Sequence, residues 1–187
     1  MPRRNVSDRT RRGPHHVYNR ARDGRAAFRD DADRDAFLGL LAARLGRGGS
    51  IAGVQVSAVC LMTTHFHLIV WQSESGALTR LMNSLTIAYV RYYNRKYGTS
   101  GPLFAGPFRS RHLRSQKDLR WTTAYVHANH PTGPTYRYST HNAYVDEHLR
   151  PGWLAAERGL SAFTDMNDYE SYMRAHAIRA ELNARFF

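Results

Sequence analysis

The 187-residue sequence contains one cysteine, two lysines and no long apolar run. Its single cysteine, Cys60, excludes both an intrachain disulfide and a zinc site built from several cysteine thiolates. No segment approaches the roughly 20 apolar residues that a membrane-spanning helix needs. The arginine-rich start of the chain also lacks the apolar segment of a secretion signal. We therefore expect a cytoplasmic protein without a membrane span.

Acidic residues are scarce beside basic ones. Arginine and lysine total 27 against 15 aspartates and glutamates, which gives a formal net charge of +12. Lys96 and Lys117 are the only lysines, so nearly all of the basic charge is arginine, whose planar guanidinium pairs with phosphates and stacks on bases. This excess predicts a polyanionic partner, with nucleic acid as the first candidate. An anionic membrane surface is the weaker alternative, since no basic amphipathic helix with a bulky apolar face is evident.

The chain has the length of one domain, and its patterning divides it into three parts. Residues 1–13 are rich in arginine and are expected to form a flexible basic arm. Residues 14–135 contain the strongest patterning and are expected to form the main domain. Residues 136–187 have weaker patterning and are expected to be an extension packed on that domain.

Hydrophobic periodicity defines the expected elements. Strands are predicted at about residues 15–20, 51–60, 65–71 and 108–115. Helices are predicted at about residues 31–45, 78–97, 119–129 and 168–184. The order strand, helix, strand, strand, helix, strand, helix predicts an α+β fold, in which an antiparallel ferredoxin-like sheet of the split βαβ type is flanked by helices.

Three of these segments carry finer expectations. In strand 51–60, simple alternation places Val54, Val56 and Ala58 on one face. Before helix 119–129, Asp118 is expected to cap the first turn. In helix 78–97, the spacing predicts an apolar stripe made of Leu78, Leu81, Leu85, Ala88 and Tyr92.

Five arginines are the candidate nucleic-acid-binding residues. Arg80, Arg91 and Arg95 lie within roughly 60° of one another on the wheel of helix 78–97, beside its apolar stripe. Such a face is explained equally well as a solvated flank or as a rail that binds phosphates. Arg109 and Arg111 alternate on the exposed face of strand 108–115.

The segment His65-Phe66-His67 is the most informative in the chain. Because successive side chains of a strand point to opposite faces, His65 and His67 project together while Phe66 points into the core. Two parallel imidazoles on a rigid strand can chelate a divalent metal. The alternative is a surface strand that merely carries two histidines, and the short motif alone favours that alternative.

Tyr125 and Asn129 lie one turn apart on predicted helix 119–129, on a side turned away from its packing residues. A phenol is a poor nucleophile unless a base or a cation activates it. By itself, Tyr125 is most simply explained as a packing tyrosine whose hydroxyl finds a partner. Its interest therefore depends on the metal site.

Several motifs together resemble one family. Residues 60–70 resemble the strand motif of the HUH single-tyrosine transposases, in which two histidines flank a hydrophobic residue. Residues 125–129 resemble the catalytic tyrosine helix of the REP-associated branch. Further matches follow in the same order along residues 14–155, at 16–20, 92–98, 101–110 and 138–144. Two features depart from the family pattern: Thr63-Thr64 replaces Pro-Asn, and His130 is inserted between Asn129 and Pro131.

The resemblance implies an HUH nuclease fold, with residues 14–135 as the catalytic domain. It implies a metal-dependent enzyme that cleaves and rejoins single-stranded or hairpin DNA, as a monomer or a homodimer. Tyr125 would attack the scissile phosphate, giving a 5′-phosphotyrosine and a 3′-hydroxyl. His65 and His67 would hold Mg²⁺ or Mn²⁺, with the amide oxygen of Asn129 as the candidate third ligand. The five arginines would bind the DNA.

Two other functions stay open at the level of sequence. A non-catalytic nucleic-acid-binding protein would keep the fold and the charge. Such a copy is expected to lose His65, His67 or Tyr125 in time, and all three are present. A zinc hydrolase is less favoured, because no carboxylate near the histidine pair provides an evident third ligand or general base.

Overall fold

The computed structural model describes residues 9–45, 51–133 and 135–186, with side chains up to residue 176 in the last helix. Residues 1–8 of the expected basic arm lie outside the described residues. The centre of the fold is a four-stranded antiparallel sheet in the order β2-β3-β1-β4. Its strands are β1 (Gly13–Arg20), β2 (Val54–Leu61), β3 (His65–Gln72) and β4 (Arg109–His112).

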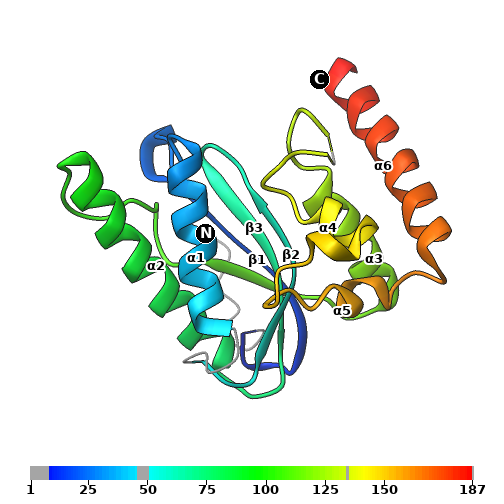
Figure 1. Ribbon diagram of the computed structural model, residues 1–187, viewed down its shortest axis with the longest axis horizontal. Helices are drawn as coiled ribbons and strands as arrows, with labels where there is room; N and C mark the ends of the chain where they lie inside the picture. The colour runs from blue at the N-terminus through cyan, green and yellow to red at the C-terminus, as the bar shows by residue number, and fades with distance from the viewer. Residues whose placement is uncertain (1–8, 46–50, 134, 187) are drawn as a thin grey trace.

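Helices cover both faces of the sheet (Figure 1). One face carries α1 (Asp31–Leu45) and α2 (Ala77–Tyr97). The opposite side carries α3 (Gln116–His127) and the later helices α4 (His141–Val145), α5 (Ala156–Leu160) and α6 (Met166–Phe186). Short 3-10 turns lie at η2 (Arg22–Gly24) and η3 (Glu147–Leu149). The predicted α+β fold with a split βαβ sheet is confirmed, because β3 lies between β1 and β2 in the sheet order.

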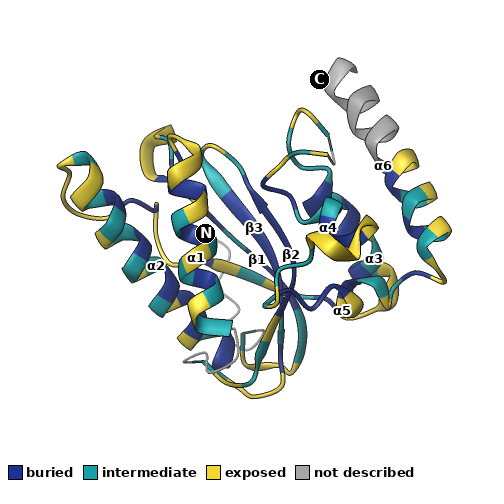
Figure 2. Ribbon diagram, in the orientation of Figure 1, coloured by how far each residue is buried: buried dark blue, intermediate teal, exposed yellow. Residues whose placement is uncertain are grey.

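The main apolar core lies between the sheet and helices α1 and α2. On β3, Phe66, Leu68 and Val70 are fully buried in this core, as their alternation with the two histidines predicted. Figure 2 shows the buried residues concentrated where the sheet meets these helices. Each such side chain stabilises the fold by about 1.5–3 kcal/mol relative to exposure.

The face toward α3 has a smaller apolar cluster. Ala58, Cys60 and Ile69 of the sheet pack there with Leu119 and Val126 of α3. Burial raises the pKa of the Cys60 thiol to about 12. This cysteine therefore behaves as a small packing residue with an unreactive thiol.

Strand β2 breaks the simple alternation expected from the sequence. A register shift between Val56 and Ala58 puts Val56 in the α1–α2 core and Ala58 in the cluster under α3. The expectation that Val54, Val56 and Ala58 share one face was therefore wrong, since an extra residue in a strand reverses the sides that follow it. The irregular residue, Ser57, accepts a hydrogen bond from the Tyr144 hydroxyl at 2.6 Å through its carbonyl.

The apolar stripe of α2 begins as predicted and then shifts by one residue. Its buried tyrosines are Tyr89 and Tyr93, whereas the predicted Ala88 and Tyr92 are only partly buried. The hydroxyl of Tyr89 donates to the carbonyl of Ala27 at 2.7 Å. A buried phenol is tolerated there because its polar end has a partner.

The first turn of α3 is capped by Ser115, so the expectation that Asp118 is the cap was wrong. The hydroxyl oxygen of Ser115 accepts from the Asp118 backbone N–H at 3.0 Å. The Asp118 carboxylate instead accepts from the Arg114 backbone N–H at 3.1 Å. This reciprocal arrangement resembles a capping box and begins the helix at Gln116, before the predicted start.

Residues that follow α3 in the sequence contact both the sheet and α3. The Ala155 backbone N–H donates to the Val56 carbonyl at 2.9 Å, which ties the start of α5 to β2. His127, near the end of α3, is fully buried, with Nδ1 2.8 Å from the Tyr169 hydroxyl and Nε2 3.0 Å from Oγ1 of Thr140. Burial lowers the pKa of His127, so the imidazole is neutral in this network.

Among the described residues, no helix is long and apolar enough to cross a membrane.

Candidate functional site

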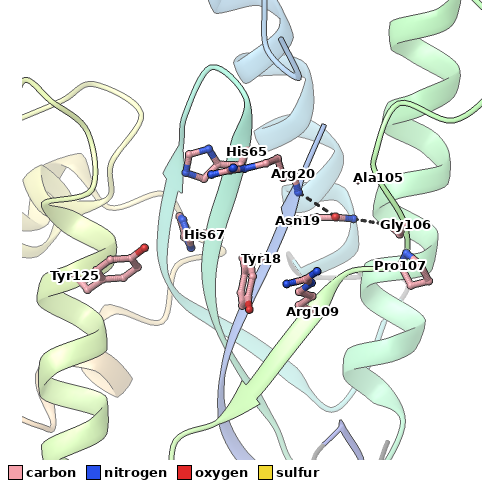
Figure 3. Close-up of a pocket in the computed structure, with 10 residues that line it drawn as sticks. All are labelled: Tyr18, Asn19, Arg20, His65, His67, Ala105, Gly106, Pro107, Arg109 and Tyr125. Carbon is pink, nitrogen blue, oxygen red and sulfur yellow. Dashed lines mark hydrogen bonds between the residues drawn. The ribbon is translucent and has the colours of Figure 1, made fainter. Parts of the chain in front are cut away.

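The two histidines of the motif lie on the sheet face that meets α3. Strand β1 pairs beside them, with Tyr18 opposite His67 and Arg20 opposite His65. Because these are register partners on adjacent strands, all four side chains project toward the same side. Helix α3 brings Tyr125 to that side, and Figure 3 shows its hydroxyl turned toward the imidazoles. The structure therefore brings His65, His67 and Tyr125 together.

These residues line one cavity of about 470 Å³. Its basic groups are the guanidiniums of Arg20 and Arg109, and no acidic residue is among the described residues that line it. The full lining consists of Tyr18, Asn19, Arg20, His65, His67, Ala105, Gly106, Pro107, Arg109 and Tyr125. A cavity with this lining favours an anionic ligand.

His67 is oriented by a second histidine beneath it. Nδ1 of His67 lies 2.9 Å from Nε2 of His16, and the two rings stack with centroids 5.1 Å apart. Burial lowers the pKa of His67 to about 3 and the pKa of His16 to about 4. Both rings are therefore neutral near pH 7, and this hydrogen bond leaves Nε2 of His67 as the nitrogen that can bind a ligand.

His65 is less buried than His67. Its Nδ1 lies 2.9 Å from Oγ1 of Thr64. Burial lowers the pKa of His65, and the nearby Arg20 adds to this effect, while the nearby side chain of Asn129 opposes it. Asn129, the predicted neighbour of Tyr125, therefore lies within reach of His65 although α3 ends at His127.

Tyr125 is enclosed by aromatic rings. Its phenol lies edge-on to His67, with ring centroids 5.3 Å apart, and edge-on to His16 at 5.8 Å. On another side, the indole of Trp121 stacks on the phenol with centroids 5.2 Å apart and only 9° between the planes. These contacts hold the ring plane while leaving the hydroxyl in the cavity.

The far wall of the cavity is the loop before β4. The side-chain amide of Asn19 donates to the Gly106 carbonyl at 3.0 Å. The Ala105 backbone N–H donates to the Arg20 carbonyl at 3.0 Å. Both bonds fix the loop to the end of β1, and Figure 3 shows the first of them. The cavity therefore has a defined wall on the side opposite Tyr125.

The five candidate arginines are not gathered at one place. Arg109 lines the cavity itself, and Arg111 lines an adjoining one. Arg91 lines a hollow over α2 that shares loop residues with the Tyr125 cavity. Arg80 forms an ion pair with Glu74 at 3.4 Å, and Arg95 is exposed; neither is among the residues that line these three hollows.

Sequence reasoning missed three contributors from β1. Tyr18 and Arg20 line the cavity, and His16 supports His67. Alternation along residues 15–20 already puts these three on one face. The missing signal was the pairing of β1 with β3, which decides that this face is the one that carries the histidine pair.

The donor set fits a divalent ion. Two neutral imidazoles, from His65 and His67, lie with ring centroids 5.1 Å apart. Among the described residues, no group of three His, Cys, Asp or Glu side chains could hold a metal. The amide of Asn129, beside His65, is the candidate for a third protein ligand.

No protein-family model and no curated protein matches the chain. In structure, it is similar to a REP-associated tyrosine transposase bound to a REP hairpin, with 18% identity, a TM-score of 0.49, and coverage of 76% of this chain and 85% of that one. A protein from Deinococcus radiodurans R1 that is named as a candidate transposase gives 12% identity, a TM-score of 0.43, and coverage of 58% and 85%.

A third similar structure is a bacterial tRNA(His) guanylyltransferase-like protein in complex with GTP. It gives 14% identity, a TM-score of 0.44, and coverage of 79% of this chain and 73% of that one. All three TM-scores are below 0.5, and two different activities stand among the three names. The likenesses therefore assign no activity to this chain.

Proposed function

We propose that this protein is a DNA-nicking and rejoining enzyme of the single-tyrosine transposase type, acting on single-stranded or hairpin DNA. One observation carries the proposal. The phenol of Tyr125, the neutral imidazoles of His65 and His67 and two guanidinium groups line one cavity that has no acidic residue in its described lining. The motifs around these residues support the reaction type.

The charge of the cavity supports a phosphodiester as the reacting group. Arg20 and Arg109 can donate hydrogen bonds to phosphate oxygens and offset their charge. A carboxylate in the same place would repel the phosphate, and the described lining contains none. The overall charge of +12 adds attraction at longer range.

His65, His67 and Asn129 are the residues that would hold a divalent ion. When bound, such an ion polarises the scissile phosphate and offsets the negative charge that develops on it. His16 fixes the ring of His67 through the bond to its Nδ1. Partners of this kind, which orient a ligand, usually affect both the affinity for the metal and the activity.

Tyr125 provides the nucleophile. Its oxygen forms a bond to phosphorus while the bond from phosphorus to the 3′ oxygen breaks. The phenol loses its proton, and the departing 3′ oxygen takes one up to become a hydroxyl. The DNA stays attached to the protein through its 5′ phosphate, so attack by a 3′-hydroxyl reverses the step and rejoins the strand.

A covalent-adduct assay tests the proposal. The protein is incubated with labelled hairpin DNA and Mn²⁺, and adducts are detected on a denaturing gel and mapped to a peptide. Tyr125→Phe keeps the ring and removes one oxygen, so it should lower adduct formation by a factor of about 10³ or more while DNA binding survives. Tyr92→Phe is the matched control, because it also removes one phenolic oxygen. The Tyr92 hydroxyl lies outside the cavity lining and donates a hydrogen bond to the Ala32 carbonyl, between α1 and α2.

Two outcomes would count against this reading. An adduct that persists in Tyr125→Phe, or that maps to another tyrosine, refutes the assignment of the nucleophile. Binding of DNA with no adduct in the wild-type protein, across divalent metals and hairpins, would favour a non-catalytic nucleic-acid-binding protein.

A further inference from the structure

A second cavity adjoins the first on the other side of Tyr125. It has a volume of about 660 Å³, within the range of pockets that hold small ligands. Tyr18, His67 and Tyr125 belong to the lining of both cavities. The rest of its lining comes from β1, β4 and the helices α3 and α6, and consists of His16, Arg111, Lys117, Asp118, Trp121 and Tyr172.

Trp121 is the most unusual residue of this second cavity. Its side chain is 44% exposed, although it is a large aromatic residue that could be buried. It already stacks in parallel on the ring of Tyr125. Because the indole is exposed and already stacks on one ring, it provides a surface on which a further flat ring can stack.

The charge around Trp121 suits a nucleotide. Arg111 and Lys117 are exposed and basic, while Asp118 is the one acidic residue in the described lining. The Asp118 carboxylate is already bonded to the Arg114 backbone N–H at 3.1 Å. With two basic side chains and one carboxylate that is already hydrogen-bonded, the cavity has a net positive charge. Its basic side chains can therefore bind a phosphate.

We infer that this second cavity binds an unpaired base of the DNA strand beside the scissile phosphate. The base stacks on Trp121, and Arg111 and Lys117 bind the adjoining backbone. The inference rests on the proposed function, since it places the reacting phosphate in the cavity on the far side of Tyr125. A paired base is already stacked within its duplex, so the pocket selects single-stranded DNA next to the cleavage point.

A binding experiment without metal tests this inference separately from cleavage. Fluorescence anisotropy compares an oligothymidylate octamer with an octamer of the same backbone that lacks all bases, both in EDTA. The wild-type protein should bind the octamer with bases about tenfold more tightly, the typical effect of one stacked base. Trp121→Leu should abolish most of this preference, and Trp121→Phe should keep part of it.

Leu149→Ala is the matched control. Leu149 is another exposed large apolar residue, 58% exposed on η3, and it lies outside both cavities. This variant should keep the full preference for bases. Thermal unfolding of each variant checks that the fold is intact.

The outcomes separate the pocket from the enzyme. An unchanged preference in Trp121→Leu, or an equal loss of affinity for both octamers, overturns the inference. A preference that depends on Trp121, in a protein that forms no adduct in the assay above, would support the base pocket while refuting the proposed cleavage.

Discussion

The two faces of the central sheet differ in what their side chains do. Strand β3 shows the difference within two residues: Phe66 is fully buried toward α1 and α2, and His67 is 6% exposed toward α3. One face gains stability by removing apolar surface from water. The other keeps neutral imidazoles beside a cavity, where burial disfavours their charged forms. The same strand can serve both purposes because its side chains alternate.

The largest expected effect comes from the apolar face. Phe66→Ala should lower the free energy of unfolding by about 3–5 kcal/mol, since it leaves a cavity in the main core. His67→Ala should lower the free energy of unfolding by no more than about 2 kcal/mol. The loss is smaller because burying a polar imidazole costs free energy, which offsets part of the stability that its contacts contribute. Urea unfolding of both variants measures the difference. Equal losses would contradict the division of roles between the faces.

Acid should lower the free energy of unfolding through the buried histidines of the polar face. Burial lowers the pKa of His67 to about 3 and of His16 to about 4, whereas an unfolded histidine has a pKa of about 6.5. Below that value the unfolded chain takes up protons that the folded protein refuses, so stability falls as the pH falls. Each histidine should cost about 2 kcal/mol between pH 7 and pH 5.

Urea unfolding at the two pH values, without metal, measures this loss. The His16→Phe variant should show a shallower pH dependence of the free energy of unfolding, because it removes one of the histidines whose pKa is lowered by burial. A wild-type stability that does not change over this range would contradict the lowered pKa values, because it would mean that the folded protein takes up as many protons as the unfolded chain.

The support of His67 by His16 can be tested through metal affinity. His16→Phe keeps a ring but removes the nitrogen that bonds Nδ1 of His67, so Mn²⁺ should bind about 10–100-fold more weakly. Isothermal titration calorimetry gives the affinity without any need for activity. His148→Phe, an exposed histidine on η3, is the control. Equal Mn²⁺ affinities in the wild type, His16→Phe and His148→Phe would show that His16 does not support metal binding.

The smallest expected effect is on the salt dependence of DNA affinity, which should distinguish arginines at the cavity from arginines elsewhere. Arg109→Gln should reduce the slope of log affinity against log salt by about 0.7, the value for one phosphate contact with a single strand. Arg80→Gln should change it less, because Arg80 pairs with Glu74 away from the cavity. Titrations of single-stranded DNA at several salt concentrations measure both slopes. Equal changes would mean that the helix face binds DNA as much as the cavity does.

Much of the fold was predictable because it depends on neighbours in the sequence. The alternation around Phe66 and the helical spacing before Tyr97 fixed the type and order of the elements. The errors arose where distant residues decide the local geometry. Ser57 in β2 accepts a hydrogen bond from Tyr144, and Tyr89, in the shifted apolar stripe of α2, donates one to Ala27.

The candidate site divides in the same way. His65, His67 and Tyr125 were identifiable from their spacing, and they meet in one cavity. Arg20 and His16 needed the register of β1 against β3, which depends on contacts across the sheet. Binding of a metal by His65, His67 and Asn129 stays a prediction, as does the binding of DNA by the five arginines.

The burial of His127 has a consequence for the order in which parts of the protein can become fixed in place. The helix that carries Tyr125 is held at its end by Thr140 and Tyr169, which the ribosome adds afterwards. The sheet and the α1–α2 core can therefore assemble on the ribosome before the tyrosine helix has its support. In a nascent chain, the position of Tyr125 would therefore become fixed only after Thr140 and Tyr169 have been added.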